Sequence, residues 1–245
     1  MISRRRILLA AFLAVISMSS CTVRGSTAPI LLFEGKGTSP SDVAAIENIL
    51  DENHLPYSTL SSSQLNEMDE SRLRRYRLLI VPGGNFVDIG NSLTTSATAN
   101  VRRAVETGLN YVGICAGGFF AADSGYNGLN LTSGVRFHFY AAEDRGIRRQ
   151  AVAISSAGGP TLDEYWEDGP QFTGWGAVVA KYPDGTPAIV EGTVGSGWVI
   201  LSGIHPEAPA RWRRDMTFNT PVNVDNAYAG KLIRAALNRE PLPHY

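Results

Sequence analysis

The sequence predicts an α/β protein with a doubly wound, mostly parallel sheet and a second half rich in strands. Three observations support this fold class. Short apolar runs alternate with amphipathic helical segments through the first half of the chain. Gly-rich turns follow two of these runs, at the strand ends where ligands collect in open α/β sheets. The later chain changes to β segments separated by Gly- and Pro-containing turns.

In the first half, apolar runs and helix signals come in strict order. Ser39 followed by Pro40 begins the first helix, with Asp42 as a capping-box variant. Residues 91–98 are polar and predict a loop. The expected strands are residues 30–33, 57–60, 78–81 and 111–114. The expected helices are residues 40–53, 64–75, 100–107 and a segment starting near residue 119.

In the second half, alternating segments predict strands at residues 133–139, 150–155, 177–182, 188–192 and 197–201. Residues 226–237 predict a closing amphipathic helix. Residues 163–171 are expected to form a loop in which aromatic side chains stand among carboxylates. Such a loop could wall a pocket for a polar substrate, or it could be a solvated loop on which one tryptophan packs.

Length and charge limit the function classes. At 245 residues the chain suits one main domain, placed at residues 29–245. The formal net charge is -1, and without the three arginines of the leader it is about -4, which does not favour nucleic acid as a partner. The two cysteines and four histidines lack metal-site spacing, so neither a metal nor a cofactor is expected.

Residues 1–21 predict an export leader, and residues 22–28 a polar tether. Three arginines precede the apolar segment 7–16, and Met18-Ser19-Ser20-Cys21 resembles a bacterial lipobox. Residues 3–8 also resemble a twin-arginine export signal. We therefore expect export to the bacterial cell envelope, with a membrane attachment only through lipid at Cys21. An ordinary cleaved signal peptide with an incidental cysteine is the alternative.

Cys115 stands where the run from Tyr111 turns into a helix. A strand, a tight turn of small residues and a helix make the geometry of a nucleophile elbow, here with a thiol. The N–H groups and partial positive charge of a helix N-terminus favour thiolate at that corner. A small buried hydrophobe is the alternative interpretation of a free cysteine.

A thiol nucleophile needs a base, and the base needs a group that orients it. His205 follows the apolar segment 197–201, and Glu207 lies two residues further on, on the same side of an extended chain. The glycine N–H groups after the strand at 78–81 are suited to an oxyanion hole. Taken alone, a loop histidine near a surface glutamate would be the better explanation of this pair.

These motifs together resemble the class I glutamine amidotransferase-like fold. The closest resemblance is to the amidotransferase-like N-terminal domain of biotin–protein ligases, in its stand-alone bacterial form. It rests on residues 81–84, 115–119, 165–170 and 203–207. It implies that Cys115 is the nucleophile, His205 the base and then the acid, and Glu207 the orienter. It also implies an oxyanion hole at Gly84 and Ala116, and a substrate-binding group of Gly83, Phe119, Tyr165 and Trp166.

The resemblance has one departure. Glutaminases of this class have Gln four residues after the nucleophile, where this chain has Phe119. We therefore expect a cysteine hydrolase that acts through a thioester on an amide or peptide-like small substrate. Two alternatives stay open: a glutamine amidotransferase subunit that needs a separate partner, and a non-catalytic ligand-binding module on the same fold.

Overall fold

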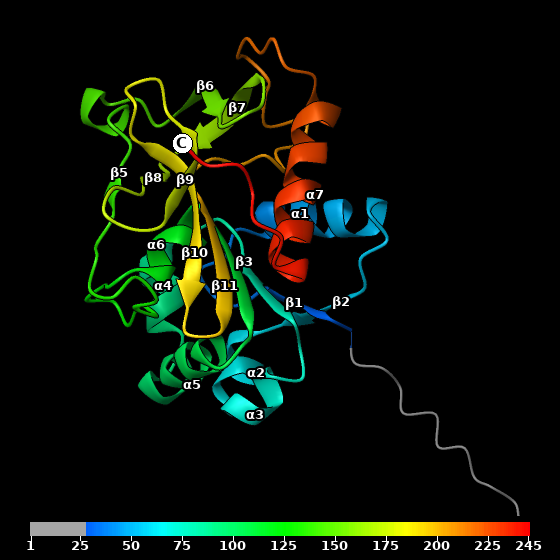
Figure 1. Cartoon of the computed structure of the whole chain (residues 1–245), viewed down its shortest axis with the longest axis vertical. Helices are drawn as coiled ribbons and strands as arrows, with labels where there is room; N and C mark the ends of the chain where they lie inside the picture. The colour runs from blue at the N-terminus through cyan, green and yellow to red at the C-terminus, as the bar shows by residue number, and fades with distance from the viewer. Residues whose placement is uncertain (1–27) are drawn as a thin grey trace, which may run out of the picture.

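One large mixed sheet organises the computed structural model, which describes residues 28–245 (Figure 1). Within those residues the sheet has nine strands in the order β2-β1-β3-β4-β11-β10-β9-β6-β7. The first five are parallel: β2 Tyr57–Leu60, β1 Ile30–Phe33, β3 Leu78–Val81, β4 Asn110–Ile114 and β11 Gly197–Ser202. The rest are antiparallel: β10 Pro187–Val194, β9 Ala177–Lys181, β6 Arg149–Ser156 and β7 Thr161–Glu167. The predicted fold class is confirmed.

Helices cover both faces of the parallel part of the sheet. Alternate side chains of each strand point to opposite faces, so Ile30 and Leu32 pack into one core and Leu31 and Phe33 into the other. The first core is closed by α1 Pro40–Glu52 and α7 Val222–Asn238, which lie together in Figure 1. The second face carries α2 Ser62–Asn66, α3 Glu70–Leu73, α4 Phe86–Asn91, α5 Thr95–Glu106 and α6 Ala116–Ala121.

Several expected elements differ from the structure. Residues 64–75 do not form one helix, because α2 and α3 are separate short helices, each with its own N-cap. Residues 91–98 are not a plain loop, since Thr94 caps α5 and starts it at Thr95. Of residues 133–139 only β5, His138–Phe139, is a strand, and it pairs with β8, Pro170–Gln171. A short 3-10 turn, Glu143–Arg145, follows.

The expected loop at residues 163–171 is wrong in its first half. Residues 161–167 form β7, an edge strand of the large sheet that pairs with β6 from Arg149↔Glu167 to Ser155↔Thr161. Cross-strand pairing overrides the polar composition, because Leu162, Glu164 and Trp166 are buried on one face. The chain turns only at Asp168 and Gly169, where Asp168 has a φ of 43°.

The predictions made for residues 1–21 and 22–28, including lipid at Cys21, fall outside the described residues, apart from Ala28 at the end of the tether. Within residues 28–245, no helix has the length and apolar character needed to cross a membrane.

Candidate active site

The sheet topology brings three strand ends to one place. β4, which leads to Cys115, lies between β3, which leads to Gly83, and β11, which leads to His205. The strands are in register at these ends, with Val81 opposite Gly113 and Ser202 opposite Ile114. Parallel neighbours present their carboxyl ends at the same edge, so segments 90 residues apart meet there.

Cys115 occupies the strained corner of a strand–turn–helix elbow. Its backbone has φ 50° and ψ −105°, a conformation that costs about 1–3 kcal/mol and persists only where the surroundings enforce it. The Cys115 N–H is tied to the carbonyl of Ser202 at 2.7 Å. Gly117 permits the close approach of the elbow, because a Cβ there would stand 1.9 Å from the Val81 carbonyl oxygen. The Cys115 thiol is free and 6% exposed, with Sγ 3.4 Å from the Glu167 carbonyl.

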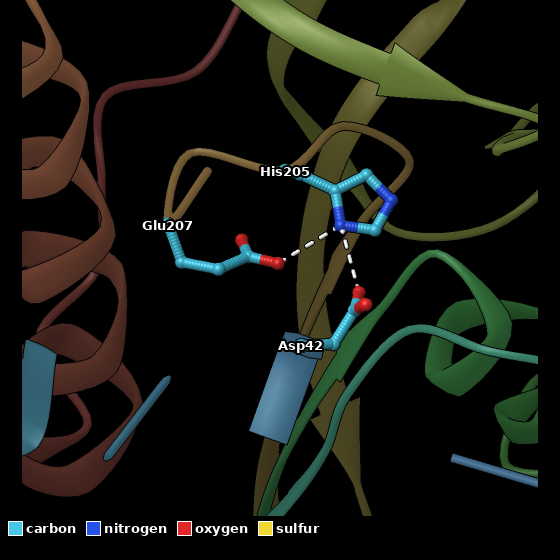
Figure 2. A group of neighbouring side chains, drawn as sticks. All are labelled: Asp42, His205 and Glu207. Carbon is cyan, nitrogen blue, oxygen red and sulfur yellow. Dashed lines mark hydrogen bonds and ion pairs between the residues drawn. The ribbon is translucent and has the colours of Figure 1, made fainter. Parts of the chain in front are cut away.

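His205 is held by two carboxylates on one ring nitrogen. Nδ1 lies 2.9 Å from Glu207 Oε1 and 3.2 Å from Asp42 Oδ1, while the other ring nitrogen points away from both (Figure 2). The His205 backbone N–H donates to the Tyr165 carbonyl at 2.8 Å, which attaches this segment to β7. A single proton on Nδ1 can be donated to Glu207, with Asp42 adding its charge alongside.

These contacts set the protonation of the group. Burial lowers the pKa of His205, but the charges of Glu207 and Cys115 and the hydrogen bond with Asp42 outweigh burial and hold the pKa well above its usual range. Burial raises the pKa of Asp42, yet the hydrogen bond and charge of His205 reverse this and leave it lowered. Burial dominates at Glu207, whose pKa stays raised despite His205. The imidazole is therefore held protonated, the form that pairs with a thiolate.

Asp42 is the site residue that sequence reasoning missed. Its capping role was expected from its place after Ser39, and its backbone N–H does donate to Ser39 Oγ at 3.4 Å. Its side chain instead turns toward His205 and is buried. The available signal was the residue type, because a capping box uses the longer Glu or Gln. Gly83 belongs to the same contact: a Cβ there would stand 2.1 Å from Asp42 Oδ1 and 2.7 Å from His205 Cε1.

Asp42, His205 and Glu207 are also a set that a cation could use, since their donor atoms lie within 4.8 Å of one another. The His205–Glu207 hydrogen bond accounts for the same geometry with a proton.

Two backbone N–H groups are free beside the thiol. Gly84 forms an isolated bridge with Thr38 in which the neighbouring residues make the hydrogen bonds. Ala116 is the first residue of α6, so its N–H has no acceptor within the helix. Within residues 28–245 neither N–H donates to a protein acceptor, and both residues line the same cavity as Cys115. An oxyanion formed when the thiol attacks a carbonyl group could accept hydrogen bonds from both N–H groups.

A cavity of about 680 Å³ opens over the thiol. Of the expected substrate-binding residues, Phe119 and Tyr165 line it, whereas Gly83 lies behind Asp42 and His205. Trp166 does not line it: strand alternation sends its side chain to the opposite face of β7, where it is 0% exposed and donates to the Gly169 carbonyl. Trp212, not expected from sequence, packs its ring edge-on to His205 at 5.8 Å.

A second buried acidic residue, Glu164, lies near His205 and Glu207. Glu164 of β7 is fully buried, and neither carboxylate oxygen has a hydrogen-bond partner within the described chain. Burial, followed by the nearby charges of Asp225 and Glu207, raises its pKa well above the usual range. Burial likewise raises the pKa of Asp225 to about 7, although Arg213 pairs with it at 2.9 Å. Burial therefore favours the protonated, neutral form of Glu164.

Comparisons with known proteins agree with this architecture. Residues 28–147 match the family described as Biotin-protein ligase, N terminal. A biotin–protein ligase from Schizosaccharomyces pombe is 28% identical over 165 residues, which are 54% of this chain and 26% of the ligase. The chain thus matches only about a quarter of that relative's length.

Solved structures share the fold. A glutamine amidotransferase has a TM-score of 0.55 at 22% identity, over 73% of this chain and 90% of that one. PurLQS from Thermotoga maritima has a TM-score of 0.55 at 15% identity, over 84% of this chain and 97% of that one. At these identities the likeness shows the fold alone.

Proposed function

Because residues 28–147 match the biotin–protein ligase N-terminal family, on a class I glutamine amidotransferase-like fold, we propose that the protein is a cysteine amide hydrolase. The observation that carries the proposal is the arrangement of His205. Two carboxylates lie at its Nδ1, and its ring lines the same cavity as the thiol of Cys115, whose backbone is strained. A histidine kept only for packing would need neither the second carboxylate nor the thiol.

In the proposed reaction the Cys115 thiolate attacks an amide carbon while the protonated His205 stands beside it. The oxyanion accepts hydrogen bonds from the N–H groups of Gly84 and Ala116. Each such donor stabilises the transition state by about 3 kcal/mol in other enzymes. The C–N bond breaks as His205 gives its proton to the leaving amine, and a thioester remains on Cys115. Water, deprotonated by His205, then hydrolyses the thioester and regenerates the thiol.

Phe119 argues against glutamine as the substrate. Its ring stacks on Phe86 with centroids 4.9 Å apart and contacts Phe139 at 4.9 Å. These rings fill the cavity wall four residues after the nucleophile with apolar surface, which offers nothing to a carboxamide or an amino acid headgroup. We therefore propose hydrolysis of an amide with an apolar acyl part and no separate synthase partner.

The test measures the reactivity of Cys115 in a protein whose Cys21 is replaced by Ser. A free thiol is only a few per cent thiolate at pH 7, so full ionisation accelerates alkylation by iodoacetamide by at most about 30-fold. We expect wild type to approach that limit and His205→Ala to lose most of it. His138→Ala, an exposed histidine of β5, is the matched control and stays at the wild-type rate.

Equal alkylation rates for wild type and His205→Ala would overturn the hydrolase proposal. Saturable binding of an amide ligand that survives Cys115→Ser, with no acyl-enzyme detected by mass spectrometry, would then favour a binding module.

We also propose export and lipid attachment through Cys21, which rest on residues 1–21 alone. Mass spectrometry of the N-terminal peptide from a bacterial expression host tests this. A diacylglyceryl-modified Cys21 supports it, and an unmodified N-terminus that retains residues 1–20 contradicts it.

A further inference from the structure

The charged side chains that line the cavity differ in whether they already have an interaction partner. Each acidic one already has a partner: Asp42 with His205 at 3.2 Å, Glu167 with the Tyr165 hydroxyl at 2.6 Å, and Asp168 with Arg148 at 3.5 Å. Arg149 and Arg211 also line the cavity. Within residues 28–245 neither guanidinium has a carboxylate at ion-pair distance or a hydrogen-bond acceptor. The cavity is thus lined by two positively charged side chains that have no anionic partner within the described residues.

Arg211 lies near His205, and Arg149 lies near the end of β7 that contacts the thiol. The Arg211 guanidinium is 5.9 Å from the ring of Trp212, which packs on His205 at 5.8 Å. Arg149 stands opposite Glu167 in the β6–β7 ladder, and the Glu167 carbonyl lies 3.4 Å from Cys115 Sγ. Arg149 and Glu167 form no ion pair, and Glu167 Oε2 instead accepts a hydrogen bond from the Tyr165 hydroxyl.

The α6 side of the thiol is apolar instead. Phe119 projects from that helix, and Phe86, at the start of α4, and Phe139 of β5 pack against it. These three rings form an aromatic wall of the cavity. The cavity wall is therefore divided, with aromatic surface on the α6 side and positive charge near His205 and the end of β7.

The distribution of charge in the cavity indicates where the acyl group and the leaving amine of a substrate would lie. In a thiol hydrolase the histidine gives its proton to the leaving amine, so that amine lies on the histidine side and the acyl group on the other. We propose, on the basis of the hydrolase function above, that the substrate is an N-acyl amino acid or a peptide's last residue. Its acyl part is aromatic or otherwise apolar, and its leaving amine bears a carboxylate that binds Arg149 and Arg211. Water enters overall, and the products are the free carboxylic acid and the amino acid.

The first experiment reads the positive charge without requiring turnover. Iodoacetate and iodoacetamide alkylate the same thiol and have nearly the same shape, but only iodoacetate is anionic. We expect Arg149→Gln and Arg211→Gln each to lower the iodoacetate-to-iodoacetamide rate ratio at Cys115 by about two- to fivefold, the range for an exposed charge pair. The ratio in wild type also falls as salt is raised.

Arg74→Gln is the matched control, because it removes one exposed positive charge at the opposite edge of the sheet. Arg74 follows α3, and the chain then enters the start of β3. An equal change of the ratio in all three variants, or no change in any, would overturn the anion-binding proposal.

The second experiment uses phenylacetylglycine and its neutral counterpart phenylacetylglycinamide. Wild type is expected to hydrolyse the carboxylate with a kcat/KM about tenfold higher than the neutral amide. Arg211→Gln is expected to lose that preference, and the control Arg74→Gln to keep it. Hydrolysis without any preference refutes the substrate class and leaves the hydrolase standing. An arginine-dependent alkylation ratio with no hydrolysis of either compound, and no effect of His205→Ala, refutes the hydrolase and leaves an anion-binding cavity.

Discussion

The contact between Gly83 and the His205 group yields a sharp prediction for Gly83→Ala. The backbone at Gly83 is outside the left-handed region, so alanine is conformationally permitted. Its Cβ would nevertheless stand 2.1 Å from Asp42 Oδ1 and 2.7 Å from His205 Cε1. Ordinary contact begins near 3.4 Å, so Asp42 must move by more than 1 Å and His205 must follow. A misplacement of about 1 Å in a catalytic group can cost on the order of 100-fold in rate.

The assay is alkylation of Cys115 by iodoacetamide at pH 7, with unfolding by urea measured alongside. We expect the rate of Gly83→Ala to fall toward that of His205→Ala, while the free energy of unfolding drops by only about 1–3 kcal/mol, the usual cost of overpacking. Gly125→Ala is the control, because Gly125 has no atom within 4 Å of the added Cβ and does not have a positive φ. A folded Gly83→Ala protein that alkylates at the wild-type rate would refute the placement of Asp42 and His205.

Three further predictions concern the buried groups. The pKa of Glu164 is raised in the folded state, so its contribution to stability is present below the unfolded-state value and is lost as pH rises toward the folded-state pKa. Urea unfolding between pH 5 and pH 7 should therefore show wild type losing stability relative to Glu164→Gln as pH rises, and parallel curves would contradict this. Asp42→Asn and Glu207→Gln should each lower the pH at which His205 titrates, as followed by imidazole NMR signals, because each weakens a contact with a carboxylate that raises its pKa. If His205 titrated at the wild-type pH in both variants, the two carboxylates would not control its pKa. Trp166→Ala should cost about 3–5 kcal/mol of unfolding free energy. A stable Trp166→Ala protein with reduced alkylation would instead place Trp166 at the cavity.

Local sequence determined the parallel half of the fold and its elbow. The apolar runs that became β1, β3 and β4 are short and bounded by turn residues, so their type and limits follow from local pattern. The small residues around Cys115 likewise indicate a strained turn by their type and spacing. The positions of β7 and α5 did not follow, because pairing with β6 and capping by Thr94 outweighed the polar composition of those segments.

Tertiary structure alone decided which side chains meet at the thiol. Spacing in sequence suggested His205 and Glu207, since two residues apart in an extended chain they share a side. Asp42 joins them from 163 residues away only because β1 lies beside β3, so that α1 starts where Gly83 leaves room for its carboxylate. Trp166 and Tyr165 are neighbours in sequence, yet strand alternation sends one to the core and the other to the cavity. Residue types name the chemistry, but the register and order of strands decide which groups are close enough to perform it.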